Sequence, residues 1–200
     1  MVVNKIISSV MQILLFALIP FVWWLITARN KESFLSWIGL KKISGSSKKI
    51  VISSMATAVC FLLLGYFILY LLQNVETAVS EFNGLGIRAI PAIFIYAVFN
   101  TAFPEELLFR GFLLKRMGSK IGFRWANVIQ ALLFGLIHCI MFWSLTGKLT
   151  AFIILAFTAL IAWAMGYINE KMADGSILPS WCIHAVSNLF SGICAAFMLI

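Results

Sequence analysis

Six apolar runs, each close to 20 residues long, constrain the fold of this 200-residue chain more than any other feature. At a rise of 1.5 Å per residue, about 20 helical residues cross the ~30 Å hydrocarbon core of a bilayer. The runs cover residues 6–26, 50–72, 89–113, 125–145, 149–168 and 179–199. They predict an all-α fold, namely a polytopic membrane bundle of about six transmembrane helices.

Composition excludes the soluble classes of protein. Hydrophobic residues make up 62% of the chain and charged residues 11%, against about 45–50% and 25% in soluble domains. A globule of 22.3 kDa leaves about a third of its surface exposed and cannot hide so much apolar area. We therefore expect residues 1–200 to form a single transmembrane domain. We read the cysteines as small buried hydrophobes, because no Cys-x-x-Cys spacing suggests a disulfide framework or zinc site: Cys60, Cys139, Cys182 and Cys194.

The net charge of +8 is explained by topology. Eleven Lys and Arg residues lie in the segments 27–49, 114–124 and 169–178, and three lie between the runs on the other side. Because cytoplasmic loops collect Lys and Arg, this bias predicts a multi-pass protein of the cell membrane. Both termini would lie outside, with loops 27–49 and 114–124 in the cytoplasm. No nucleic-acid partner is expected.

Two N-terminal features need a structural interpretation. The first run is predicted to be an uncleaved helix rather than a signal peptide, because Arg29 and Lys31 follow it directly, as expected of a stop-transfer flank. The segment 33–42 is either a short interfacial helix on the inner leaflet or a basic linker with a few buried aromatic residues.

Ionisable side chains inside the runs are the strongest functional signal. Each costs about 2.5–3.5 kcal/mol at the centre of an inserted helix, so such residues are functional candidates. The chain has only two histidines, and they lie in different runs. The candidates are Glu105, Glu106 and Arg110 in the third run, His138 in the fourth, and His184 with Asn188 in the sixth.

Helical spacing divides the acidic pair into two roles. Glu106 and Arg110 are four residues apart and share a helix face, so they are predicted to form a structural ion pair. Glu105 points about 100° away and remains free to act as a general base. The alternative is a purely structural salt bridge between helices. Pro104, directly before the pair, fits either a kink or a first-turn position.

The remaining polar residues are ambiguous one by one. His184 and Asn188 share a face of their helix, where they could hydrogen-bond a neighbouring helix or donate to a developing oxyanion. His138 could be hydrogen-bonded within the bundle or take part in catalysis. Together, a carboxylate, two imidazoles and an amide in one membrane bundle are the inventory of a hydrolase.

In this order, Glu105-Glu106-x-x-x-Arg110, Phe134-x-x-x-His138 and His184-x-x-x-Asn188 resemble a known family. The pattern is similar to that of the CAAX prenyl endopeptidase and bacteriocin-processing superfamily of intramembrane glutamate proteases. The resemblance spans residues 100 to 190, within a predicted catalytic core at 89–200. Residues 1–88 carry no recognised motif. The chain is shorter than the eukaryotic CAAX proteases, which favours a prokaryotic member and leaves prenylated substrates open.

The resemblance implies a role for each candidate. Glu105 would activate a water, His138 would help to position it, and His184 with Asn188 would stabilise the oxyanion. Glu106 and Arg110 would hold the site together. The activity would be hydrolysis of a peptide bond in a membrane-associated peptide or protein, with membrane lipid as the surroundings.

Three alternatives stay open at the level of sequence. Zinc catalysis could use Glu105, His138 and His184 as ligands, although no His-Glu-x-x-His motif is present and we expect no cofactor. A non-catalytic immunity or scaffold protein could keep the same residues for structure. An ion-coupled transporter could use buried Glu and His as a relay, but the halves of the chain lack the symmetry typical of transporters.

Overall fold

The computed structural model describes residues 1–200 and is helical, with no β-strand. Its main helices agree with the six predicted runs to within a few residues, except that the third is longer at its C-terminal end. The α-helices are α1 Val2–Thr27, α2 Phe34–Trp37, α3 Ser47–Leu71, α4 Ile90–Ile95, α5 Phe103–Glu106, α6 Lys115–Ile121, α7 Phe123–Phe142, α8 Lys148–Tyr167 and α9 Leu178–Ala196. The 3₁₀ and π segments are η1 Ser80–Phe82, η2 Gly86–Ala89, η3 Tyr96–Ala102, η4 Leu107–Leu114 and η5 Ile168–Met172.

One continuous helix of 36 residues, Gly86–Ile121, contains the acidic pair. We call it the long helix; it comprises η2, α4, η3, α5, η4 and α6. The π-helical segment η3 ends two residues before Pro104, which occupies a first-turn position of α5. A proline ring lacks an N–H and clashes with the carbonyl four residues earlier, so a wider turn before it lets the helix continue. Pro104 thus lies within the continuous long helix rather than at its start, and the π-helical turn before it accommodates the ring.

Five helices are long and apolar enough to cross a membrane. They are α1, α3, the long helix, α7, and α8 with its extension η5. The sixth predicted run forms α9, which has 19 residues but does not reach the same apolarity. The physical reason is its polar side chains, among them His184 and Asn188, which contact the long helix. The protein is therefore a polytopic helical membrane bundle in which α9 is the one long helix below that apolarity.

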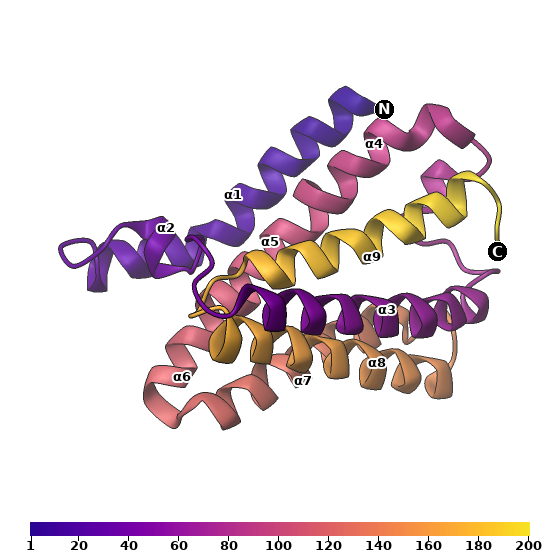
Figure 1. The fold of residues 1–200 in the computed structure, drawn as a ribbon. Helices are drawn as coiled ribbons and strands as arrows, with labels where there is room; N and C mark the ends of the chain where they lie inside the picture. The colour runs from indigo at the N-terminus through magenta and orange to yellow at the C-terminus, as the bar shows by residue number, and fades with distance from the viewer.

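The helix α9 runs through the middle of the bundle (Figure 1). It packs against η3 of the long helix on one side and against α3 on the other. In contrast, α1 and α3 bury very little of their own surface, 11% and 6% of their most apolar windows. These two helices therefore present apolar side chains outward, where a bilayer would cover them.

Small residues allow α7 and α8 to lie in close contact. A Cβ at Gly135 would come within 2.6 Å of the Leu155 carbonyl oxygen, and one at Gly166 would overlap the Asn127 amide. Asn127 donates to the Trp163 carbonyl at 2.9 Å, and Gln130 donates to the Ala162 carbonyl at 3.1 Å. Such small residues and cross-helix hydrogen bonds are typical of membrane helix contacts.

The segment after α1 is buried by protein rather than laid on a surface. Trp37 and Ile38 are 3% and 0% exposed, and they pack with Leu107 and Phe112 of the long helix. A Cβ at Gly111 would lie 2.7 Å from the Ile38 carbonyl oxygen, so the two backbones are in contact. Of the two interpretations of 33–42, the linker with buried aromatic residues fits better, because α2 is only four residues long and Trp37 packs against the long helix.

Three basic segments meet at one end of the bundle. Lys115 of the long helix donates to Glu170 at 2.6 Å and to the Gly175 carbonyl at 2.7 Å. Lys41 pairs with Asp174 at 3.4 Å, which ties the 27–49 segment to the loop before α9. Both chain termini lie at the opposite end (Figure 1). The three basic segments 27–49, 114–124 and 169–178 therefore lie at the same end of the bundle, as the distribution of charge predicts.

Candidate active site

Glu106 and Arg110 form an ion pair at the centre of the bundle. Arg110 Nη1 lies 2.9 Å from Glu106 Oε1, and both side chains are 0% exposed. The guanidinium carbon of Arg110 also lies 4.6 Å from the centroid of the Phe134 ring, a cation–π contact that joins the long helix to α7. The pairing expected from the four-residue spacing is therefore present, with the arginine held from two sides.

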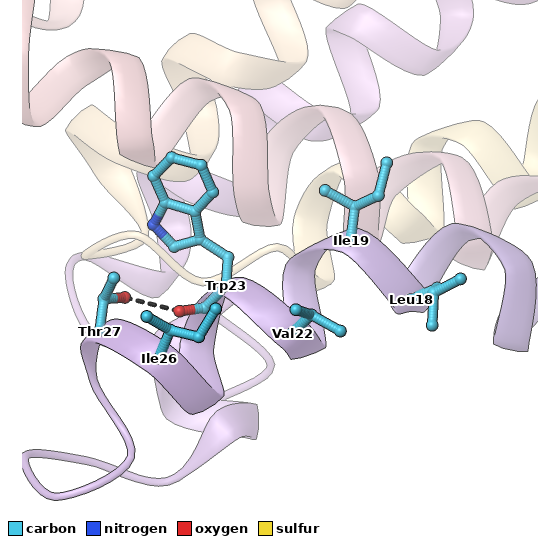
Figure 2. A pocket seen from close by; sticks show the side chains of 6 residues that line it. All are labelled: Leu18, Ile19, Val22, Trp23, Ile26 and Thr27. Atoms are coloured by element: carbon cyan, nitrogen blue, oxygen red, sulfur yellow. Dashed lines mark hydrogen bonds between the residues drawn. The ribbon is translucent and has the colours of Figure 1, made fainter.

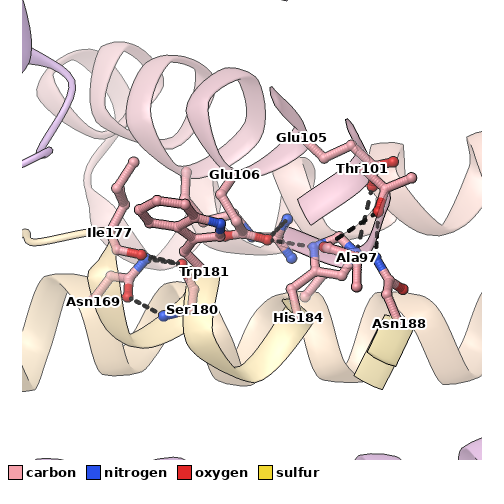
Figure 3. A network of polar contacts seen from close by, with 12 residues as sticks. Ala97, Thr101, Glu105, Glu106, Asn169, Ile177, Ser180, Trp181, His184 and Asn188 are labelled. Carbon is pink, nitrogen blue, oxygen red and sulfur yellow. Dashed lines mark hydrogen bonds and ion pairs between the residues drawn. The ribbon is translucent and has the colours of Figure 1, made fainter. Parts of the chain in front are cut away.

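His184 of α9 lies between the two carboxylates (Figure 3). Its Nδ1 is 3.0 Å from Glu106 Oε1, and its Nε2 is 3.7 Å from Glu105 Oε2. Because a carboxylate accepts hydrogen bonds, Nδ1 carries a proton and donates to Glu106. The gap of 3.7 Å on the Nε2 side exceeds a direct hydrogen bond and suits a bridging water.

Asn188, one turn beyond His184, is also fixed against the long helix (Figure 3). Its amide Nδ2 donates to Thr101 Oγ1 at 2.6 Å. Thr101 in turn donates to the backbone carbonyl of Tyr96 at 3.1 Å. Glu105, His184 and Asn188 are therefore brought to one stretch of the interface between η3, α5 and α9.

Two further contacts set the position of α9. Trp181 Nε1 donates to the Val98 carbonyl of the π-helical segment at 2.9 Å. At the start of α9, Asn169 and Ser180, both fully buried, exchange hydrogen bonds of 2.7 and 3.2 Å. In Figure 3, Asn169, Ser180 and Trp181 lie on one side of His184 and Asn188 lies on the other. The face of α9 that carries the candidate residues is thus clamped at several points.

His138 is near this group but has no hydrogen bond to either carboxylate. Its Nδ1 donates to the Phe134 carbonyl at 2.9 Å, and its ring packs on the Phe134 ring at 4.6 Å. The same Phe134 ring meets the His184 ring edge-on at 5.9 Å. With the proton on Nδ1, the Nε2 of a neutral His138 is a hydrogen-bond acceptor. The Phe134 ring therefore contacts both imidazoles and places His138 in the neighbourhood of His184.

Several charged atoms of the site have no hydrogen-bond partner in the protein. Glu105 Oε2 and Glu106 Oε2 are buried without such a partner, as are Nε and Nη2 of Arg110. Buried polar atoms without protein partners are places where water or a polar substrate group binds. A water, a carbonyl or an amide beside the Glu105 carboxylate would give these atoms the partners that the protein does not supply.

The ligands proposed for zinc are not gathered around one point. No group of three His, Cys, Asp or Glu side chains is arranged to hold a metal ion. His138 is directed to the Phe134 carbonyl through Nδ1, and His184 to Glu106. The donor set that the zinc alternative requires is therefore not assembled in this arrangement.

A hollow on α1 offers no competing chemistry. Leu18, Ile19, Val22, Trp23 and Ile26 line it together with Thr27. The hydroxyl of Thr27 donates to the Trp23 carbonyl of the same helix at 2.7 Å (Figure 2). Because its lining has no ionisable side chain, this hollow suits hydrocarbon and not a hydrolytic reaction.

Fold and site together define the class of protein. It is a polytopic helical membrane bundle with a carboxylate pair, an arginine, an imidazole and an amide at a buried helix interface. The family comparison agrees: residues 87–190 match the model of the type II CAAX prenyl endopeptidase Rce1-like family, and the chain belongs to that family. No curated protein and no solved structure gave a significant match.

Sequence reasoning missed Thr101 and Trp181. Thr101 is an ordinary residue for a membrane helix, and its bond to Asn188 joins positions 87 residues apart. Trp181 lies near a helix end, where aromatic residues are common in membrane proteins, but its indole N–H donates to the Val98 carbonyl of the π-helical segment. The one available signal was the four-residue spacing of Thr101 and Glu105, which places them on the same face of a helix.

Proposed function

We propose that this protein is an intramembrane endopeptidase that hydrolyses a peptide bond of a membrane-associated peptide or protein. The observation that carries the proposal is the placement of His184 between Glu105 and Glu106, with Asn188 one turn away. A purely structural ion pair needs only Glu106 and Arg110 and gives no reason for a second carboxylate facing the imidazole. Family membership supports the same class of activity.

The proposed reaction begins with a water at Glu105 Oε2. Glu105 removes one proton as the water oxygen attacks the scissile carbonyl carbon, while the acceptor Nε2 of His138 positions the second hydrogen. The resulting oxyanion is stabilised by an N–H of Asn188 and by the Nε2–H of a His184 ring that carries both protons, while Nδ1–H stays on Glu106. As the C–N bond breaks, Glu105 returns its proton to the leaving amine.

Glu106 and Arg110 have a supporting role in this proposal. Glu106 holds the Nδ1 proton of His184, which directs Nε2 toward Glu105. Glu106 orients the His184 imidazole, and the positive charge of Arg110 balances the buried negative charge of Glu106. No metal enters any step, and chelator treatment is expected to leave activity unchanged.

A cleavage assay in proteoliposomes tests the proposal. The probe is a set of membrane-anchored peptides of varied sequence, each made with and without a prenyl group on a C-terminal Cys-containing tetrapeptide, with products read by mass spectrometry. The wild type is expected to cut at least one peptide. Glu105→Gln is expected to lower kcat by at least about 100-fold, since general-base catalysis contributes about 10²–10⁴-fold. No product from any peptide, or full activity of Glu105→Gln, would contradict the proposal.

The orientation in the membrane is proposed from the distribution of charge. The end that carries the 27–49 and 114–124 segments would face the cytoplasm, and both termini would lie outside. A phosphatase that is active only outside the cell, fused after Ile200, is expected to be active. An inactive fusion, with activity when the enzyme is inserted in 27–49, would reverse the orientation.

A further inference from the structure

Asn188 makes its one side-chain hydrogen bond through a residue outside the three motifs. Its Nδ2 lies 2.6 Å from Thr101 Oγ1, the shortest of the contacts that η3 makes with α9. An asparagine amide has two N–H groups and a carbonyl, and either end can face a hydroxyl. The state of the Thr101 hydroxyl therefore decides which end of Asn188 faces the long helix.

The π-helical geometry of η3 determines that state. In a regular helix a threonine hydroxyl bonds to the carbonyl three or four residues earlier. Here Thr101 Oγ1 is 3.1 Å from the Tyr96 carbonyl, five residues earlier, and 3.5 Å from that of Ala97. Its single proton is thus used within η3, and toward Asn188 the oxygen can only accept.

We propose that Thr101 is a positioning residue that holds the amide of Asn188 in the orientation needed for oxyanion stabilisation. The inference rests on the proposed function. With its proton donated to Tyr96, Thr101 accepts one N–H of Asn188 and excludes the flipped amide, which would place two acceptors together. The second N–H of Asn188 then remains for the reacting carbonyl, on the side of α9 that also carries His184.

Kinetics of Thr101→Val test this proposal with the peptide that the wild type cleaves. Valine keeps the shape of threonine and removes the acceptor. We expect kcat to fall by about 10- to 100-fold with KM unchanged, because a displacement of about 1 Å can cost 100-fold in rate. Thr101→Ser keeps the hydroxyl and is expected to restore most of the activity.

Two comparisons separate positioning from folding. Thr158→Val is the matched control: Thr158 is buried on α8, and its hydroxyl donates to the Ile154 carbonyl at 2.7 Å within the same helix. It is expected to leave kcat unchanged. In an Asn188→Ala background, Thr101→Val is expected to cause no further loss, because the group that it positions is gone.

The outcomes distinguish this inference from the proposed function. Full activity of Thr101→Val, or a further tenfold loss in the Asn188→Ala background, would overturn the positioning role while leaving a Glu105-dependent peptidase intact. Full activity of Glu105→Gln would instead remove the proposed function. Equal losses in Thr101→Val and Thr101→Ser would show that the hydroxyl does not by itself maintain activity and would likewise overturn the inference.

Discussion

At the scale of single residues, the site is a chain of charges that share one imidazole. Arg110 neutralises Glu106, Glu106 accepts from His184 Nδ1, and the other side of that ring faces Glu105. Glu106 Oε1 is shared by Arg110 and His184, whereas Glu105 makes no direct hydrogen bond and its Oε2 lies 3.7 Å from His184 Nε2. The two adjacent acidic residues therefore have different chemical duties.

Glu106→Gln tests this division of duties. The substitution leaves the fully buried Arg110 without its counter-charge, and breaking a buried pair by removing one partner costs about 3–5 kcal/mol. We expect a lower midpoint of thermal unfolding in detergent as well as lost activity. Glu105→Gln serves as the matched control and is expected to unfold close to the wild type, because Glu105 is partly exposed. Equal unfolding midpoints for the two variants would contradict the assignment.

The residue scale also shows what spacing can and cannot reveal. The Glu106–Arg110 pair followed from their separation of four residues, since both lie on one helix. The bond between His184 and Glu106 joins residues 78 positions apart, so it depends on helix packing that no local pattern specifies. The contacts of Phe134 with both imidazoles likewise depend on the packing of separate helices.

At the scale of helices, close approach depends on glycine. The α7–α8 pair holds Phe134 and His138 in place, and Gly135 lies where the two backbones come nearest. A methyl group there would meet the Leu155 carbonyl oxygen at 2.6 Å and Ala159 Cβ at 2.9 Å. The two helices would have to separate to admit it.

Gly135→Ala is therefore expected to destabilise the protein by about 1–3 kcal/mol, the usual cost of overpacking a well-packed contact. Gly118→Ala is the control, since a methyl group at Gly118 meets only Ala126 Cβ, at 3.9 Å. Alanine at an unstrained helical position is neutral or stabilising by up to about 1 kcal/mol. Thermal unfolding of both variants checks the pair, and an unchanged midpoint for Gly135→Ala would show that α7 and α8 are not tightly packed.

The presence of the six helices could be predicted from the length of the apolar runs. Their π-helical turns and the burial of the α2 region could not. The six runs appear as helices because their composition leaves few other solutions in lipid. The π-helical turns, in contrast, depend on Pro104 and on contacts with Trp181 and Asn188 from α9. The burial of the α2 region was equally hidden, because Trp37 and Ile38 suit a membrane surface as well as a protein interior.

At the scale of the whole molecule, α9 is a polar helix placed inside an apolar bundle. The helices α1 and α3 bury little of their own surface and present their apolar side chains to the lipid. This division lets α9 carry His184, Asn188 and Ser180 without exposing them to hydrocarbon. At the basic end of the bundle, Lys115 pairs with Glu170 and so holds the segment before α9 against the long helix.

The central claim is that Glu105 and His184 share a water. An experimental structure of the protein in lipid, at a resolution that shows ordered water, is the most direct measurement. The account predicts a water within about 2.6–3.2 Å of both Glu105 Oε2 and His184 Nε2 in the wild type. A Glu105 carboxylate bonded only to protein donors, in a site without water, would contradict it.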